Sequence, residues 1–92
     1  MTPEGRVEDY LCRQCKKRGV LCYKFTSPSN TGVPDRILVC NGKTIFVELK
    51  APGETPRKKQ LYVIRKLKAA GADVRVADSN ETISQILDEI CN

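Results

Sequence analysis

The sequence contains no histidine, which limits the metal sites that its cysteines can form. Cys12, Cys15 and Cys22 have a spacing compatible with zinc, but they lack a fourth ligand because Cys40 falls in a predicted strand. On a helix Cys12 and Cys15 share one face, where free cysteine packs as a small apolar residue. We therefore favour core packing for these thiols, and a zinc-bound interaction protein is the alternative.

The sequence also lacks long apolar runs. No stretch approaches the roughly 20 apolar residues that span a bilayer, and the N-terminus has neither the charged start nor the apolar run of a secretory signal. Five cysteines, an odd number, indicate free thiols in a reducing compartment. These features lead us to expect a protein in the cytoplasm of the host cell, away from membranes. The sequence has no repeat or low-complexity tract, so we expect one domain over residues 1–92.

The charge balance favours a polyanionic partner. Sixteen lysines and arginines face eleven acidic residues, for a formal net charge of +5. Six of these basic residues fall in one predicted helix: Arg57, Lys58, Lys59, Arg65, Lys66 and Lys68. Nucleic acid is the first candidate partner. The segment after Ala77 has no basic residue, so it is better suited to closing the sheet or contacting a second subunit.

The stretch from Gly32 to Lys50 predicts a β-hairpin. Two apolar runs flank Asn41-Gly42, which is the strongest short signal for a two-residue turn. Such a turn pairs Cys40 with Lys43 across the strands. Continued along the strands, this register places Asp35 opposite Glu48, with Cβ atoms roughly 4.5 to 5.5 Å apart.

Two opposed carboxylates repel each other unless a cation lies between them. Mg²⁺ is typically held by one or two carboxylates, with water and phosphate oxygens completing its shell. Lys50 lies two residues beyond Glu48 and so points to the same face of the strand. Taken singly, Asp35 would be a turn residue and the other two an exposed strand edge. The ordered set instead predicts a metal site with a nearby ammonium group.

Caps and apolar periodicity predict the remaining elements. A first helix begins after Thr2 and stops before Gly19, with Val7, Leu11 and Cys15 on its apolar face. A second helix begins at Thr55-Pro56 and ends by Gly71, with Gln60 heading its inward face. The other expected elements are a strand over 20–25, a loop over 26–33, a strand over 73–77 and a final helix that Ser79 caps and that runs through Ile90. The expected order is α-β-β-β-α-β-α.

Pro34-Asp35 followed by Glu48-x-Lys50 resembles the PD-(D/E)xK nucleases. A longer set of motifs resembles the virus-type replication-repair nuclease (VRR-NUC) branch: Tyr23-Lys24-Phe25, Gly32-Val33-Pro34-Asp35-Arg36, Phe46-Val47-Glu48-Leu49-Lys50-Ala51-Pro52 and Gln60. The resemblance covers nearly the whole chain. It implies an α/β fold with a restriction-endonuclease-like core, in which helices flank a mixed sheet.

The resemblance also implies a metal centre. Asp35, Glu48 and the backbone carbonyl of Leu49 would hold Mg²⁺ or Mn²⁺. An acidic residue of the first helix would complete the shell; Glu8 is the first choice for this role and Glu4 the second.

Lys50 would orient or deprotonate the attacking water, with assistance from Gln60. We expect DNA contacts from a set of basic residues: Lys24, Arg36, Arg57, Lys58 and Lys59. The expected function is a metal-dependent DNA endonuclease, as in stand-alone phage members. It would act on branched DNA, such as a Holliday junction, as a homodimer. The alternative is an inactive nucleic-acid-binding module with the same fold.

Overall fold

The computed structural model describes residues 1–91 and confirms the predicted order of elements. The elements are α1 (Pro3–Arg18), β1 (Leu21–Lys24), β2 (Arg36–Cys40), β3 (Lys43–Leu49), α2 (Lys58–Ala69), β4 (Asp73–Ala77) and α3 (Asn80–Cys91). None of the helices in this part of the chain is both long and apolar enough to cross a membrane.

Helix α1 has the boundaries that its caps predict. The Thr2 hydroxyl accepts a hydrogen bond from the Gly5 amide at 3.0 Å, and Pro3 occupies the first turn. Gly19 ends the helix in the left-handed conformation, with φ 70°. Val7, Leu11 and Cys15 are buried, so the predicted apolar face of α1 is confirmed.

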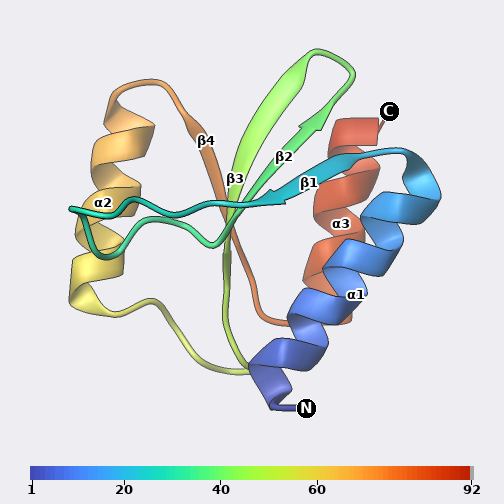
Figure 1. Cartoon of the computed structure of the whole chain (residues 1–92), viewed down its shortest axis with the longest axis horizontal. Helices are drawn as coiled ribbons and strands as arrows, with labels where there is room; N and C mark the ends of the chain where they lie inside the picture. Colours follow the sequence, from blue (N-terminus) through green and yellow to red (C-terminus); the bar gives the residue numbers. More distant parts are fainter. Residues whose placement is uncertain (92) are drawn as a thin grey trace.

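The sheet has the strand order β1-β2-β3-β4 and is mixed. β1, β2 and β3 pair antiparallel, whereas β4 runs parallel to β3. Cys40 pairs with Lys43 across the turn, where Asn41 and Gly42 have φ of 53° and 75°. The predicted hairpin register is therefore confirmed. Figure 1 shows the sheet with α2 on one side and with α1 and α3 on the other.

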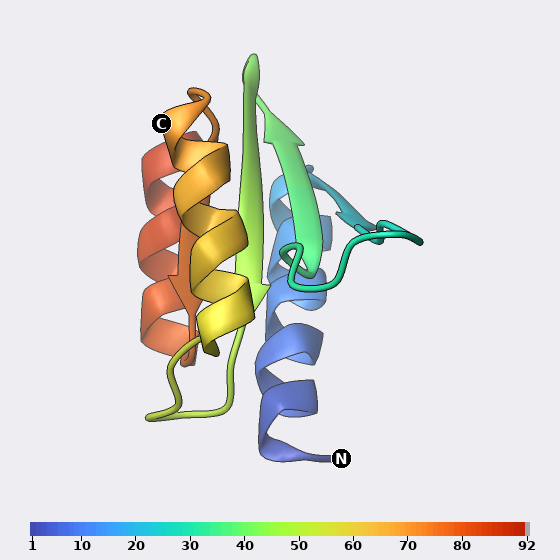
Figure 2. The same cartoon turned by 90° about the vertical axis from the view of Figure 1, so that its left-hand side faces the viewer.

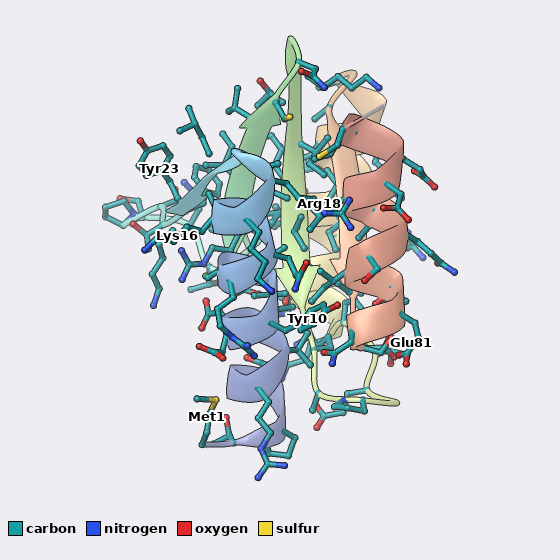
Figure 3. All side chains as sticks on the ribbon, turned by 90° about the vertical axis from the view of Figure 1, so that its right-hand side faces the viewer. Met1, Tyr10, Lys16, Arg18, Tyr23 and Glu81 are labelled. Carbon is teal, nitrogen blue, oxygen red and sulfur yellow. The ribbon has the colours of Figure 1, made fainter. Side chains whose placement is uncertain are left out.

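The core lies mainly between the sheet and the α1–α3 layer. Leu38, Ile45 and Val47 are buried on this side of the hairpin. They meet the predicted apolar stripe of α3, which is also buried: Ile83, Ile86, Leu87 and Ile90. Tyr10 and Arg18 of α1 point toward α3, as Figure 3 shows, and join the two helices. Their partners are the Ser84 hydroxyl at 3.1 Å and the Asp88 carboxylate at 2.7 Å.

The α2 side of the sheet is less completely covered. Ile37, Val39 and Phe46 point to this side of the hairpin and are only half-buried. Helix α2 packs chiefly on β4, at one edge of the sheet, and therefore leaves β1 and β2 partly open. Figure 2 shows α2 from this side, with the loop that precedes β2 in teal.

Helix α2 begins later than predicted. The prediction placed the N-cap at Thr55, but the observed N-cap is Arg57 and the first helical residue is Lys58. The side-chain carbonyl of Gln60 accepts a hydrogen bond from the Arg57 amide at 2.8 Å. This reach-back from the third helical position fixes the helix start and overrides the Thr55-Pro56 signal.

Gly32 anchors the loop that leads to Asp35. Its φ is 87°, and a Cβ atom there would lie 2.9 Å from the Lys59 Cγ and 3.0 Å from the Lys59 carbonyl oxygen. The loop is thus packed directly against the start of α2, and only glycine fits both the conformation and the space.

We predict that Gly32→Ala destabilises the fold more than Gly42→Ala. Both glycines have positive φ, but a Cβ at Gly42 meets nothing within 4 Å. Gly42→Ala should therefore cost about 1 kcal/mol through backbone strain, and Gly32→Ala about 1 to 3 kcal/mol more through overlap with α2. Urea unfolding of both variants measures the difference. Equal losses would show that the loop does not need this close contact.

Candidate active site

The centre of the site is the carboxylate of Glu48 on β3, which is 1% exposed. Its Oε2 accepts a hydrogen bond from the Gln60 side-chain amide at 2.8 Å and lies 3.6 Å from the Lys50 ammonium. Its Oε1 is buried and has no hydrogen-bond partner among the described residues. A buried acceptor without a partner is costly, so this oxygen is free to accept a hydrogen bond or to ligate a cation.

Asp35 lies directly before β2 and meets the end of β3. Arg36 pairs with Val47, and the next step of that register brings Asp35 opposite Glu48. The Asp35 Oδ2 accepts a hydrogen bond from the Leu49 amide at 2.8 Å. Asp35 is also held by its backbone, because its carbonyl accepts a hydrogen bond from the Phe25 amide at 2.9 Å. The structure therefore brings the two predicted carboxylates together.

The environment of Glu48 makes its ionisation unfavourable. Burial, followed by the negative charge of Asp35, raises the pKa of Glu48 from 4.5 to about 7. The Lys50 ammonium opposes this shift by stabilising the carboxylate. One lysine is not enough to offset burial and a neighbouring acid.

Lys50 is also buried, with 6% exposure. Its amide donates to the Ala77 carbonyl at 2.9 Å, which extends the pairing between β3 and β4 by one residue. This hydrogen bond fixes the backbone of Lys50, and the side chain lies beside Glu48. The predicted convergence of two acids and an ammonium is present.

Gln60 connects this cluster to the start of α2. Its side-chain nitrogen donates to Glu48, while its side-chain oxygen accepts from the Arg57 amide at 2.8 Å. Both ends of the amide are thus engaged by the protein. Gln60 orients the Glu48 carboxylate through Oε2 and leaves Oε1 without a hydrogen-bond partner among the described residues.

The residues present fit a small divalent cation. A divalent cation would relieve the repulsion between the two carboxylates and would engage Glu48 Oε1, which has no partner within residues 1–91. The Leu49 carbonyl follows directly on β3. Within residues 1–91, no three His, Cys, Asp or Glu side chains are grouped to hold a metal ion. A cation here would therefore complete its shell with water or substrate oxygens, as Mg²⁺ commonly does.

The structure does not bring Glu8 to the carboxylate pair. Glu8 accepts a hydrogen bond from the Arg36 guanidinium at 3.1 Å, so a predicted metal ligand and a predicted DNA contact engage each other. Glu4, the second choice, is close enough for its charge to help raise the pKa of Glu48. The metal-binding role of either residue stays a prediction.

The other predicted DNA contacts are exposed. Lys24 lies at the end of β1, and Arg57, Lys58 and Lys59 surround the start of α2. The first turn of α2 contains no acidic residue. The helix N-terminus carries a partial positive charge of its own, so this end of α2 is a favourable place for phosphate groups.

Three of the five cysteines form a separate cluster between α1 and β1: Cys12, Cys15 and Cys22. Cys15 is buried and belongs to the core, while Cys12 and Cys22 are half-buried. A hydrogen bond from the Cys15 thiol lowers the pKa of Cys22 to about 6, against the effect of its own burial. The packing of Cys15 agrees with the apolar role that we favoured.

Comparisons with known proteins agree with this geometry. No protein-family model matches the chain. A phage protein named "Putative nuclease p44", from Acyrthosiphon pisum secondary endosymbiont phage 1, is 47% identical over 85 residues, which cover 91% of this chain and 90% of the relative. A solved structure described as a VRR_NUC domain has a TM-score of 0.87 at 28% identity, over 96% of this chain and 97% of that one.

The chain belongs to the VRR-NUC family. This membership confirms the predicted resemblance and the predicted fold class. It also supports a nuclease function, since the family is one of nuclease domains and the phage relative carries that name. No sequence motif of this VRR-NUC domain marks Tyr62 and Lys66, which line a hollow together with Lys59. The signal in the sequence was an aromatic residue between two basic runs, at 57–59 and 65–68.

We predict that the stability of the metal-free protein falls as pH rises from about 4.5 to about 7. The raised pKa means that folded Glu48 holds its proton through this window, whereas the unfolded chain has lost it. The free energy of unfolding should decline by on the order of 2 to 3 kcal/mol, and Mg²⁺ should reduce the decline. Urea unfolding at a series of pH values, once in EDTA and once in Mg²⁺, measures the decline and the effect of the cation.

Glu48→Gln should remove most of this pH dependence, because the neutral amide does not titrate. Glu81→Gln, which alters an exposed glutamate of α3, serves as the control and should keep the slope. A slope that survives in Glu48→Gln would contradict the assignment.

Proposed function

We propose that residues 1–92 form one nuclease domain that hydrolyses DNA phosphodiester bonds internally and requires a divalent cation. The observation that carries this proposal is the buried Glu48 carboxylate, with Oε1 unpaired and with Asp35 and Lys50 beside it. Membership of the VRR-NUC family and a relative named as a nuclease support the same conclusion.

Asp35, Glu48 and the Leu49 carbonyl would hold Mg²⁺ or Mn²⁺. When bound, such an ion neutralises charge on the phosphate and makes water a better nucleophile. The Leu49 amide donates to one oxygen of Asp35, which fixes the orientation of that carboxylate. Gln60 fixes Glu48 in the same way. Both acids are therefore oriented before substrate binds, which lowers the cost of reaching the reactive geometry.

Lys50 would act directly on the reacting groups. Its ammonium is buried next to Glu48, where electrostatic interactions are stronger than in water. From there it would orient the attacking water and stabilise negative charge on the phosphate oxygens, and in its neutral amine form it would take a proton from the water. Gln60 acts through Glu48 and so is a positioning residue.

The start of α2 would bind the DNA backbone. Arg57, Lys58 and Lys59 are exposed there, and Gln60 links this turn to Glu48. Phosphates held by these side chains and by the helix N-terminus would lie close to the carboxylates. Lys24, at the end of β1, would add a phosphate contact at the start of the loop over residues 25–35.

We predict that the purified protein cleaves DNA when Mg²⁺ or Mn²⁺ is added and loses this activity in EDTA. Asp35→Asn keeps an oxygen for the Leu49 amide but removes a charge, and it should slow cleavage at least about 100-fold. Lys50→Ala should have a similar effect. Gel assays of DNA cleavage and DNA binding, run in parallel, measure both properties.

Lys17→Ala is the control for Lys50→Ala, because Lys17 is an exposed lysine of α1. This variant should cleave at nearly the normal rate. DNA binding without cleavage in the wild-type protein, at any concentration of Mg²⁺ or Mn²⁺, would reject the proposal in favour of an inactive binding module.

Selectivity for branched DNA, such as a Holliday junction, and assembly as a homodimer complete the proposal. A small basic surface contacts phosphates and therefore reads DNA shape more than base sequence. A symmetric dimer would supply two sites for two strands. On the open side of the sheet, the exposed Leu21 and Tyr23 of edge strand β1 offer an apolar surface for a second copy.

We predict that light scattering gives about twice the chain mass of 10.3 kDa. Leu21→Asp should shift the protein toward the monomer, because a charge on this strand opposes apolar contact. Thr26→Asp, at an exposed position just after β1, should leave the mass unchanged. A monomer at working concentration would exclude the dimer, and equal cleavage of branched and linear DNA would exclude selectivity.

A further inference from the structure

A hollow of about 310 Å³ lies between α2 and the loop that precedes Asp35. Its volume is at the lower end of the range for small-ligand sites. Helix α2 contributes Lys59, Tyr62 and Lys66, and the loop contributes Ser27 and Asn30. Phe25 forms part of the lining and packs against Phe46 of the sheet, with the ring centroids 5.2 Å apart and the planes tilted by 56°.

The lining combines an aromatic ring with positive charge. Tyr62 is 58% exposed although it lies on a helix that packs against the sheet. The Lys66 ammonium lies 5.3 Å from the centre of the Tyr62 ring and covers one of its faces. The charged residues of the lining are Lys59 and Lys66, both basic. Such a surface suits a flat, electron-rich ring that carries a phosphate.

The hollow shares both of its walls with the candidate active site. On one wall, Lys59 directly precedes Gln60, which donates to Glu48. On the other wall, Val33 lies two residues before Asp35. The rise of an α-helix places Tyr62 and Lys66 roughly 3 and 9 Å along α2 from Gln60. These distances correspond to about one to three nucleotide steps along a strand.

We propose that this hollow binds the base of an unpaired nucleotide next to the phosphodiester bond that is cut. The base stacks on the free face of Tyr62, Lys59 and Lys66 hold the flanking phosphates, and Ser27 and Asn30 face the base edge. A paired base cannot enter, because its ring is covered by its neighbours in the duplex. This inference rests on the proposed nuclease function and adds the class of DNA that the site selects.

The test is a binding measurement that does not depend on cleavage. The Asp35→Asn variant, in EDTA, is titrated into a duplex that carries one extra, unpaired 2-aminopurine, and into the same duplex with that base paired. Stacking should quench the fluorescence of the unpaired base. Adding Tyr62→Ala should weaken binding to the unpaired form by about 5- to 100-fold and change binding to the paired form less than twofold.

Further variants separate the contribution of ring stacking from that of charge. Tyr62→Phe keeps the ring and should retain binding. Lys66→Ala should weaken binding to the unpaired form more than Lys68→Ala does, since both lysines are exposed on α2 but Lys68 is not part of the hollow. The proposal fails if Tyr62→Ala has no effect, if it weakens both DNA forms equally, or if the base is not quenched.

The nuclease proposal is tested separately by cleavage of DNA by the wild-type protein with Mn²⁺. Quenching that depends on Tyr62, without any cleavage, would support the base pocket and reject the nuclease. Cleavage without quenching would support the nuclease and reject the base pocket.

Discussion

The structure depends on one unfavourable placement, a glutamate carboxylate buried in the sheet opposite an aspartate. Glu48 is almost fully covered, and burial together with Asp35 raises its pKa to about 7. An ionised acid in this position lowers the stability of the metal-free fold, because it is buried and repelled by Asp35. The surrounding residues must therefore hold Glu48 in place. Sites of this kind, where stability is lost for no structural gain, are where function is normally located.

Several elements serve this one group. The hairpin turn at Asn41-Gly42 sets the register that brings Asp35 to it. Gln60 reaches it from α2, and the same side chain defines where that helix begins. The backbone of β4 fixes Lys50 through Ala77. The loop before Asp35 packs on α2 at Gly32, so the site and the neighbouring hollow share a wall. The carboxylate pair, the start of α2 and the hollow are therefore linked through contacts of Gln60 and Gly32.

Much of this could be predicted from local sequence. Caps define α1, and a two-residue turn with fixed register follows from Asn-Gly, so the opposition of Asp35 and Glu48 was predictable. Contacts between distant segments were not. The Glu8–Arg36 ion pair depends on how α1 is rotated against the sheet, which apolar periodicity does not determine to one residue. The start of α2 was misplaced because a side chain from inside the helix overrides a strong local signal.

Whether Asp35 and Glu48 hold a cation can be measured directly by anomalous diffraction. A crystal grown with Mn²⁺ is measured at a wavelength where manganese scatters anomalously. We predict one anomalous peak between the Asp35 carboxylate and the Glu48 Oε1, within bonding distance of the Leu49 carbonyl. This peak should disappear in Asp35→Asn. A well-ordered protein at saturating Mn²⁺ with no peak there, or with its peak at the Cys12–Cys22 cluster, would contradict it.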